Sequence, residues 1–272
     1  MGRMERKRNR KKTRIRATIR LLAMVAFLAA VTYLAIHFYS SYKNKKLYED
    51  LALSEDTVTE EISRVNADFM QKVKELQQEN SDVKGWIRIE GTNINYPLLQ
   101  GTDNEFYVTH NYKKENSRFG SIFINCNSNI EDVNSNIIIY GHDMQNDTQM
   151  FADMLKYKEK EFYEAHPVIR IITEKTDTEY EIIHVFKSRV FYENETNVFR
   201  YYHYYNLDSE EIYSEYLRNC KEIELYNTEV IANYGDQLLT LITCEYSQEN
   251  GRFVIIARKV HDNIEEVTDN TL

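Results

Sequence analysis

Proline and glycine are scarce in this sequence, with 2 and 8 residues respectively in a chain of 272. So low a content argues against long flexible Pro/Gly linkers. The sequence also has no cluster of metal-ligating side chains at short spacing, so we expect no metal site and no cofactor. The composition of 42% hydrophobic and 28% charged residues indicates a globular domain of ordinary size with added segments.

Acidic residues are nearly missing from the first 20 positions, which hold ten Lys and Arg against the single Glu5. The whole chain nevertheless has a net charge of −9, so a basic tail precedes an acidic body. An acidic body disfavours nucleic-acid binding, and we expect no nucleic-acid partner.

Charge is absent altogether from the next segment, Leu21–Tyr39, whose 19 residues include no Asp, Glu, Lys or Arg. A helix of this length rises about 28 Å, close to the ~30 Å of a bilayer core, which predicts a single transmembrane helix. A cleaved signal peptide is the alternative; the long run and the lack of a clear A-x-A site disfavour it. The positive-inside rule then predicts a cytoplasmic N-terminus, with residues 44–272 outside the cell.

The sequence contains only three cysteines, which is an odd number: Cys126, Cys220 and Cys244. In an exported domain at least one of three thiols stays unpaired, and an unpaired exported thiol indicates a reactive group. A Cys126–Cys220 disulfide is compatible with this count, and the sequence leaves that pairing open.

Short strands dominate the rest of the chain. Apolar residues at helical spacing predict helices at Val58–Gln78, Met150–Ala165 and Ser209–Leu225. Alternating or continuous apolar runs predict strands at residues 86–99 (a hairpin), 120–125, 136–141, 168–173, 180–191, 237–244 and 252–260. Many short strands with few helices between them indicate a small mixed, mainly-β barrel.

Three chemically versatile side chains lie at the ends of these strands. Cys244 ends one apolar strand, His142 follows another, and Arg252 begins a third. Strand ends are rigid positions from which side chains can converge. A cysteine nucleophile needs a proton-exchanging partner and positive charge where an oxyanion develops, which His and Arg supply. Each residue alone has an ordinary interpretation, as a core thiol, a turn residue or a solvated edge charge.

Together these residues belong to motifs that resemble one enzyme family. The segments TLITC, YGH and GRFVI resemble the cysteine, histidine and arginine strands of sortases, at Thr240–Cys244, Tyr140–His142 and Gly251–Ile255. Further segments look like upstream sortase strands, at Gly85–Ile89, Asn95–Pro97 and Gly120–Ile124. The resemblance covers about Asp82 to Val260, and the helices expected before the barrel and before the cysteine strand are similar to class B.

The resemblance implies a sortase-like closed β-barrel of about eight strands, with N-terminal helices and a helix before the cysteine strand. The chain is then organised as a basic cytoplasmic tail, a transmembrane helix, an extracellular helical spacer, a catalytic barrel and an acidic tail. The corresponding ranges are 1–20, 21–39, 40–82, 83–261 and 262–272.

It also implies a membrane-anchored cysteine transpeptidase of a Gram-positive cell surface. Cys244 would attack a threonine carbonyl in the C-terminal sorting signal of a secreted protein, and a cell-wall amine would resolve the thioacyl-enzyme. His142 would serve as the acid and base, and Arg252 would hold the carbonyl or oxyanion. The backbone N–H of Glu245 is a further candidate donor to the oxyanion. Thr243 and Tyr140 are candidates to line the substrate groove.

Three alternatives remain open. One is a pilus-polymerising sortase whose amine comes from a lysine of another protein, and another is a cysteine protease with water as acceptor. A third is a non-catalytic binding module on the same barrel, which the intact set of Cys244, His142 and Arg252 disfavours.

The charge distribution predicts which side of the membrane each part occupies. Protease added to spheroplasts should digest residues 44–272 and spare the basic tail, because the Lys/Arg cluster adjoins the apolar run. Immunoblots against tags at either end would measure this digestion. If residues 44–272 are protected, the predicted topology is wrong.

Overall fold

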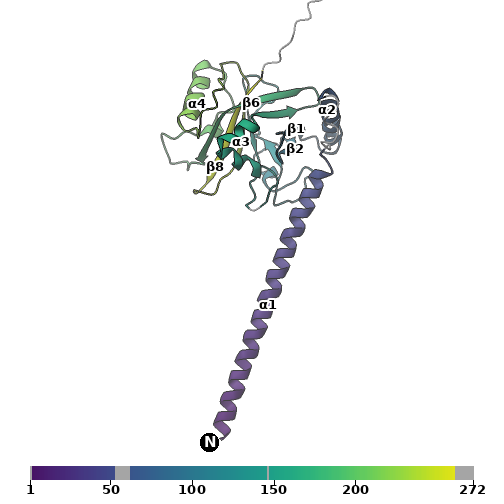
Figure 1. Ribbon diagram of the computed structural model, residues 1–272, viewed down its shortest axis with the longest axis vertical. Coiled ribbons are helices and arrows are strands. Elements are labelled where there is room, and N and C mark those ends of the chain that lie inside the picture. Colours follow the sequence, from purple (N-terminus) through teal and green to yellow (C-terminus); the bar gives the residue numbers. More distant parts are fainter. Residues whose placement is uncertain (1, 53–61, 146, 261–272) are drawn as a thin grey trace, which may run out of the picture. The chain divides into compact units, whose positions relative to one another are not determined.

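A computed structural model describes residues 2–52, 62–145 and 147–260, and it divides into two compact units, Met1–Leu51 and Ala52–Leu272. The first unit is the helix α1, Gly2–Glu49 (Figure 1). In the described part of the chain, Arg16–Glu49 of α1 is the one stretch long and apolar enough to cross a membrane. The segment Leu21–Tyr39 lies within it, so α1 is a candidate transmembrane span. The acidic tail, 262–272, lies outside the described residues.

Helix α2, Ile62–Glu79, occupies most of the range in which a helix is expected, and positions 58–61 lie outside the described residues. Phe69, Val73 and Leu76 recur at helical spacing and are all buried. The ring of Phe69 packs at a centroid distance of 5.6 Å from the buried ring of Trp86. These contacts hold α2 against the first strand of the barrel.

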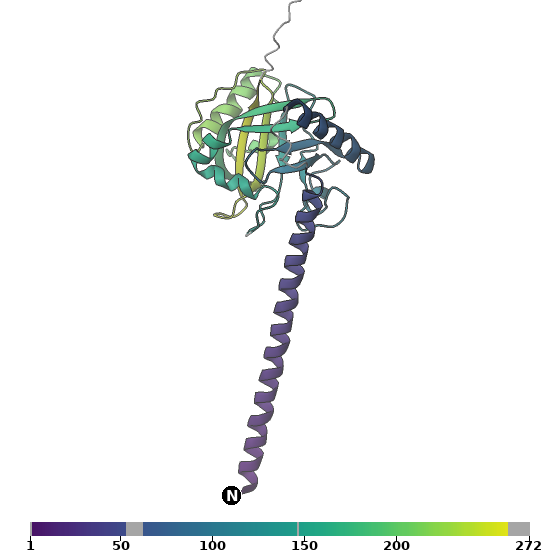
Figure 2. The ribbon, with the colours of Figure 1, turned by 45° about the vertical axis from the view of Figure 1, so that its right-hand side comes forward.

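Eight strands form a closed barrel in the order β1-β2-β3-β4-β7-β8-β6-β5, which confirms the expected architecture. Their bounds are β1 Val83–Arg88, β2 Asn95–Leu99, β3 Ile122–Ile124, β4 Asn136–Tyr140, β5 Val168–Ile172, β6 Asp177–Arg189, β7 Leu238–Cys244 and β8 Gly251–Lys259. Closure pairs each of these described strands with a neighbour on both sides. Both views place α2 and α4, Glu210–Glu222, on opposite sides of this barrel (Figure 1, Figure 2).

The connections between strands carry the remaining helical segments. The region expected to be helical, Met150–Ala165, contains a 3₁₀ segment, Ala152–Lys158, followed by the short helix α3, Lys160–Ala165. Two further 3₁₀ turns are Phe106–Val108 and Tyr201–His203. Helix α4 begins after Ser209, whose Oγ accepts a hydrogen bond from the N–H of Ile212 at 3.2 Å as an N-cap.

Strand β7 is buried along its length and lies between β4 and β8. It runs parallel to β4, with Ile138 opposite Thr240 and Tyr140 opposite Ile242, and antiparallel to β8. A strand covered on both faces is expected to be a continuous apolar run, and the LLTLIT sequence of residues 238–243 has this character.

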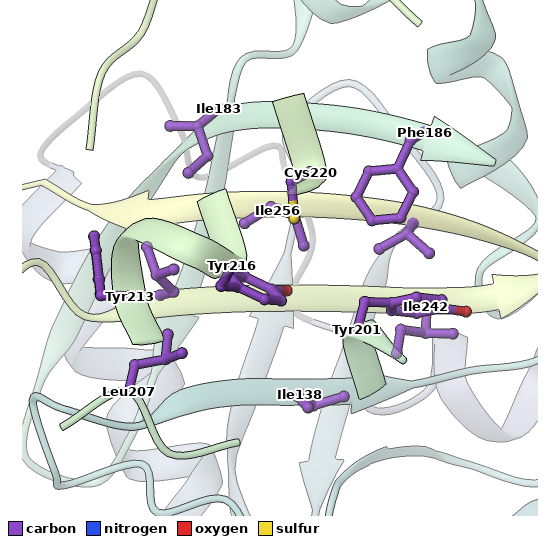
Figure 3. Close-up of a cluster of buried hydrophobic side chains, with 12 residues drawn as sticks. Ile138, Ile183, Phe186, Tyr201, Leu207, Tyr213, Tyr216, Cys220, Ile242 and Ile256 are labelled. Atoms are coloured by element: carbon purple, nitrogen blue, oxygen red, sulfur yellow. The ribbon is translucent and has the colours of Figure 1, made fainter. Parts of the chain in front are cut away.

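Helix α4 covers one side of β7 with three buried side chains, Tyr213, Tyr216 and Cys220. They pack into a cluster with residues of β4, β6, β7 and β8, including Ile138, Phe186, Ile242 and Ile256 (Figure 3). Complete burial raises the pKa of the Cys220 thiol well above its usual value. This thiol is free and part of the core, as is expected of a small apolar residue.

A polar network is enclosed in the same core. The Thr240 hydroxyl donates to Oδ1 of Asn136 at 2.8 Å and lies 3.0 Å from the Tyr216 hydroxyl. The side-chain amide of Asn136 donates to the carbonyl of Tyr204 at 2.9 Å. The side chains of Asn136, Thr240 and Tyr216 are fully buried, so the network ties α4 and the loop before it to β4 and β7.

Replacing Thr240 by Val removes the central hydroxyl without changing the side-chain shape. Asn136 and Tyr216 then lose a buried partner, and the free energy of unfolding should fall by about 1–3 kcal/mol. Urea unfolding of the full-length chain in detergent measures this. The exposed Thr102→Val is the matched control and should change stability by less than about 0.5 kcal/mol; equal effects in both variants would contradict the role of the network.

Candidate active site

The parallel pairing of β4 and β7 brings Cys244 and His142 to the same end of the barrel. Tyr140 lies opposite Ile242, and each chain continues two residues further to His142 and Cys244. The N–H of Gly141 donates to the carbonyl of Ile242 at 3.2 Å, which extends the pairing beyond the strand. Two residues far apart in the sequence are thereby placed side by side.

The antiparallel pairing of β7 and β8 places Arg252 directly opposite Cys244. Directly opposed residues of an antiparallel pair have Cβ atoms only about 5 Å apart, on the same face. The turn needs glycine at position 251, because a Cβ there would lie 2.2 Å from the carbonyl oxygen of Glu245. The guanidinium of Arg252 donates to the carbonyl of Gly251 at 2.9 Å, which holds the side chain near the strand end.

The imidazole of His142 is oriented by a hydrogen bond of 2.8 Å between Nε2 and the carbonyl oxygen of Val108. A carbonyl oxygen only accepts, so Nε2 carries a proton in this arrangement. The ring nitrogen left to take up or release a proton is therefore Nδ1. The acid/base group expected from the sequence is held by a loop 34 residues away in the chain.

A cavity of about 270 Å³ opens at this end of the barrel. Its lining contains Cys244, His142 and Arg252 together with Tyr140 and Thr243. The other lining residues are Asn104, Val108, Phe123, Gly141, Val190, Tyr201, Tyr202 and Ile242. The structure thus brings together all three of the main expected residues and two of the three groove candidates.

Two tyrosines of this cavity, Tyr201 and Tyr202, were not singled out by the sequence analysis. Tyr201 is fully buried, and its hydroxyl has no hydrogen-bond partner among the described residues. Burial raises the pKa of Tyr201, against the opposing effect of Arg252, so its hydroxyl stays protonated. The aromatic run YYHYY at residues 201–205 was the signal in the sequence that could have indicated this wall.

Glu245 occupies a different environment from the one expected. Its backbone N–H donates to the carbonyl of Gly251 at 3.0 Å, within the β7–β8 hairpin. This N–H could bind an oxyanion only if the bond to Gly251 broke. Burial acts to raise the pKa of its carboxyl, but hydrogen bonds from Ser247 and Lys187 outweigh it and lower the pKa to about 2. The carboxylate lies 3.2 Å from Nζ of Lys187 and 3.5 Å from Nζ of Lys158.

Other cysteines and histidines lie outside this constellation. Cys126 is a free thiol whose N–H donates to Oδ1 of Asn104 at 2.8 Å. His184, in β6, is buried against Glu224, with Nδ1 2.7 Å from the carboxylate. Among the described residues, no group of three or more His, Cys, Asp or Glu is placed to hold a metal ion.

The arrangement has the parts that covalent acyl transfer requires. A partly exposed thiol can act as a nucleophile, an oriented imidazole can move protons, and a guanidinium can face a developing oxyanion. The rigid strand ends hold these groups in position before a substrate binds. The fold and the site together define a barrel with the equipment of a cysteine acyl-transfer enzyme.

Comparisons with known proteins agree with this class. The family model described as the sortase domain matches residues 87–260. Sortase B of Listeria monocytogenes is 37% identical over 200 residues, which cover 73% of this chain and 78% of that protein. The chain belongs to the sortase family of cysteine transpeptidases. Within the family it is of class B.

Solved structures show the same architecture. The complex of Staphylococcus aureus sortase B with a substrate has a TM-score of 0.68 at 26% identity, covering 81% of this chain and 98% of that one. A sortase B complexed with triglycine has a TM-score of 0.69 at 27% identity, covering 81% of this chain and 99% of that one. The closed barrel is therefore shared along nearly the full length of those chains.

The position of Arg252 predicts a loss of turnover when its guanidinium is changed. Arg252→Ala should lower kcat roughly 10²–10³-fold if the side chain stabilises the oxyanion. Arg252→Lys should be impaired as well, because an ammonium lacks the planar fork. Steady-state kinetics measure both; a rise in KM larger than the fall in kcat would instead indicate substrate positioning.

Arg258→Ala is the matched control on the same strand. Arg258 lies opposite Leu238 at the other end of β7 and pairs with Glu181 at 2.8 Å. Its variant should remain active. Activity near that of the wild type in both Arg252 variants would remove Arg252 from the site.

Proposed function

We propose that this transpeptidase cleaves the C-terminal sorting signal of a secreted protein after threonine and joins the new carboxyl end to a cell-wall amine. The observation that supports this most directly is the convergence of Cys244, His142 and Arg252 on one cavity at the mouth of the barrel. Membership of the sortase family supplies the reaction class, and the site supplies the groups that such a reaction needs.

The first half of the reaction forms a thioester. The Cys244 thiol gives its proton to His142 as its sulfur attacks the threonine carbonyl carbon, and the carbonyl oxygen becomes an oxyanion beside Arg252. Collapse of this intermediate breaks the carbon–nitrogen bond, and His142 gives a proton to the departing amine. The C-terminal part of the substrate leaves, and its N-terminal part remains on Cys244.

The second half transfers the acyl group. An incoming primary amine attacks the thioester carbonyl, and His142 takes up the proton that this nitrogen loses. Cys244 departs as thiolate and takes this proton back from His142, which restores the starting enzyme with a new amide bond in the product. Two similar structures, a substrate complex of S. aureus sortase B and a sortase B with triglycine, support the proposal of a peptide donor and an amino-terminal acceptor.

The N-terminal helix supports a location at the cell membrane. Apolar side chains along α1, such as Phe27 and Phe38, are exposed, and the basic residues of positions 1–20 precede them. An exposed apolar surface of this length is stable in a bilayer and unfavourable in water. We therefore propose that the helix anchors the enzyme with the barrel on the outer side, where secreted substrates pass.

The decisive experiment mixes the full-length chain in detergent with peptides that contain candidate sorting signals, with and without triglycine. We expect a product whose mass equals the peptide through its threonine plus the amine. Cys244→Ala should abolish it, whereas Cys126→Ala should not, because Cys126 is not part of the cavity lining. Mass spectrometry reports the product and, in trapped reactions, the thioester on Cys244.

Two outcomes would overturn the proposal. An active Cys244→Ala variant would exclude the thioester route. Cleavage that yields only the free acid, whatever amine is added, would indicate a protease with water as acceptor.

A further inference from the structure

Tyr246 lies two residues after Cys244, in the turn between β7 and β8. Its hydroxyl donates to the carbonyl oxygen of Asp143 at 2.6 Å. Asp143 directly follows His142, so this bond joins the chain just after the nucleophile to the chain just after the acid/base group. The two residues are 103 positions apart in the sequence.

A matching bond lies on the other side of the same pair. The hydroxyl of Thr243, just before Cys244, donates to the carbonyl of Gly141, just before His142, at 2.8 Å. The β4–β7 ladder ends with Tyr140 opposite Ile242, so both side-chain bonds lie where regular pairing has stopped. Cys244 and His142 are thus bracketed by two hydrogen bonds that cross from one strand end to the other.

The environment of Tyr246 keeps its hydroxyl a donor. Burial, followed by the nearby Cys244 and Asp143, raises the pKa of Tyr246 above its usual value, so the phenol stays protonated at neutral pH. The same hydroxyl interacts with the side chain of Cys244. The residue as a whole is 53% exposed, so its ring adds little to the core.

We infer that Tyr246 is a positioning residue of the acyl-transfer reaction: its hydroxyl fixes the loop that carries His142 against the strand end that carries Cys244. This inference rests on the proposed roles of Cys244 and His142. Without the bond, the imidazole is held by Val108 and the Thr243 link alone, and the distance between thiol and imidazole varies more widely. A small displacement of reacting groups lowers the rate of chemistry more than it weakens substrate binding.

The test is Tyr246→Phe in the full-length chain, which removes one oxygen atom and leaves the ring. We expect kcat to fall roughly 2- to 10-fold, the effect of one hydrogen bond, with KM within about twofold of the wild type. The rate of iodoacetamide alkylation of Cys244 at a fixed pH should also fall, because the imidazole that can take up the thiol proton is held less closely to the sulfur. A merely structural role would leave this alkylation rate unchanged.

Tyr234→Phe is the matched control. Tyr234 is 47% exposed and its hydroxyl also donates to a backbone carbonyl, that of Asp208 at 2.8 Å, but Asp208 is not adjacent to any residue that lines the cavity. It should match the wild type in kcat and in alkylation.

The inference fails if Tyr246→Phe equals the wild type in both measurements, or if both tyrosine variants lose activity equally. Turnover that survives Cys244→Ala would instead refute the proposed function itself. Running the cysteine and tyrosine series together therefore separates the two failures.

Discussion

The position of β7 between a parallel and an antiparallel neighbour is the constraint on which the rest of the molecule depends. The register with β4 sets His142 beside Cys244, and the register with β8 sets Arg252 opposite the same residue. Since side chains alternate between the two faces of a strand, a slip of one residue in either pairing would turn one partner away from the others. The buried apolar run of β7 makes such a slip costly, because it would exchange core and surface side chains.

The hydrophobic cluster beneath α4 shares residues with the wall of the active-site cavity. Tyr201 and Ile242 belong both to the hydrophobic core and to the wall of the cavity, as their adjacent positions in Figure 3 illustrate. The network of Asn136, Thr240 and Tyr216 satisfies polar groups that would otherwise be buried without partners. Packing of α4 therefore stabilises the strands that carry the site, and Tyr201 and Ile242 of the same cluster form part of the cavity wall.

Few charged side chains line the cavity. Of the described residues that line the cavity, Arg252 is the only Lys or Arg, and none is Asp or Glu. The nearby carboxylate of Glu245 is engaged elsewhere, by Lys187 and Lys158. A single guanidinium against mostly apolar walls acts in a lower effective dielectric than water, which strengthens its attraction for a developing oxyanion. Both the family and the geometry are thus consistent with a cysteine transpeptidase.

The sequence by itself determined most of the local elements and the apolar span, and it predicted the candidate site residues, because these features depend on neighbours within a few positions. The TLITC and NIIIYG runs predict buried strands, and TLITC, YGH and GRFVI carry the family resemblance that implies both the eight-stranded barrel and the site residues. Only the tertiary structure decided that Val108 orients His142, that Tyr201 lines the cavity and that the N–H of Glu245 is taken by Gly251. These contacts depend on strand order and loop path, where residues far apart in the chain meet through pairings that no local pattern encodes.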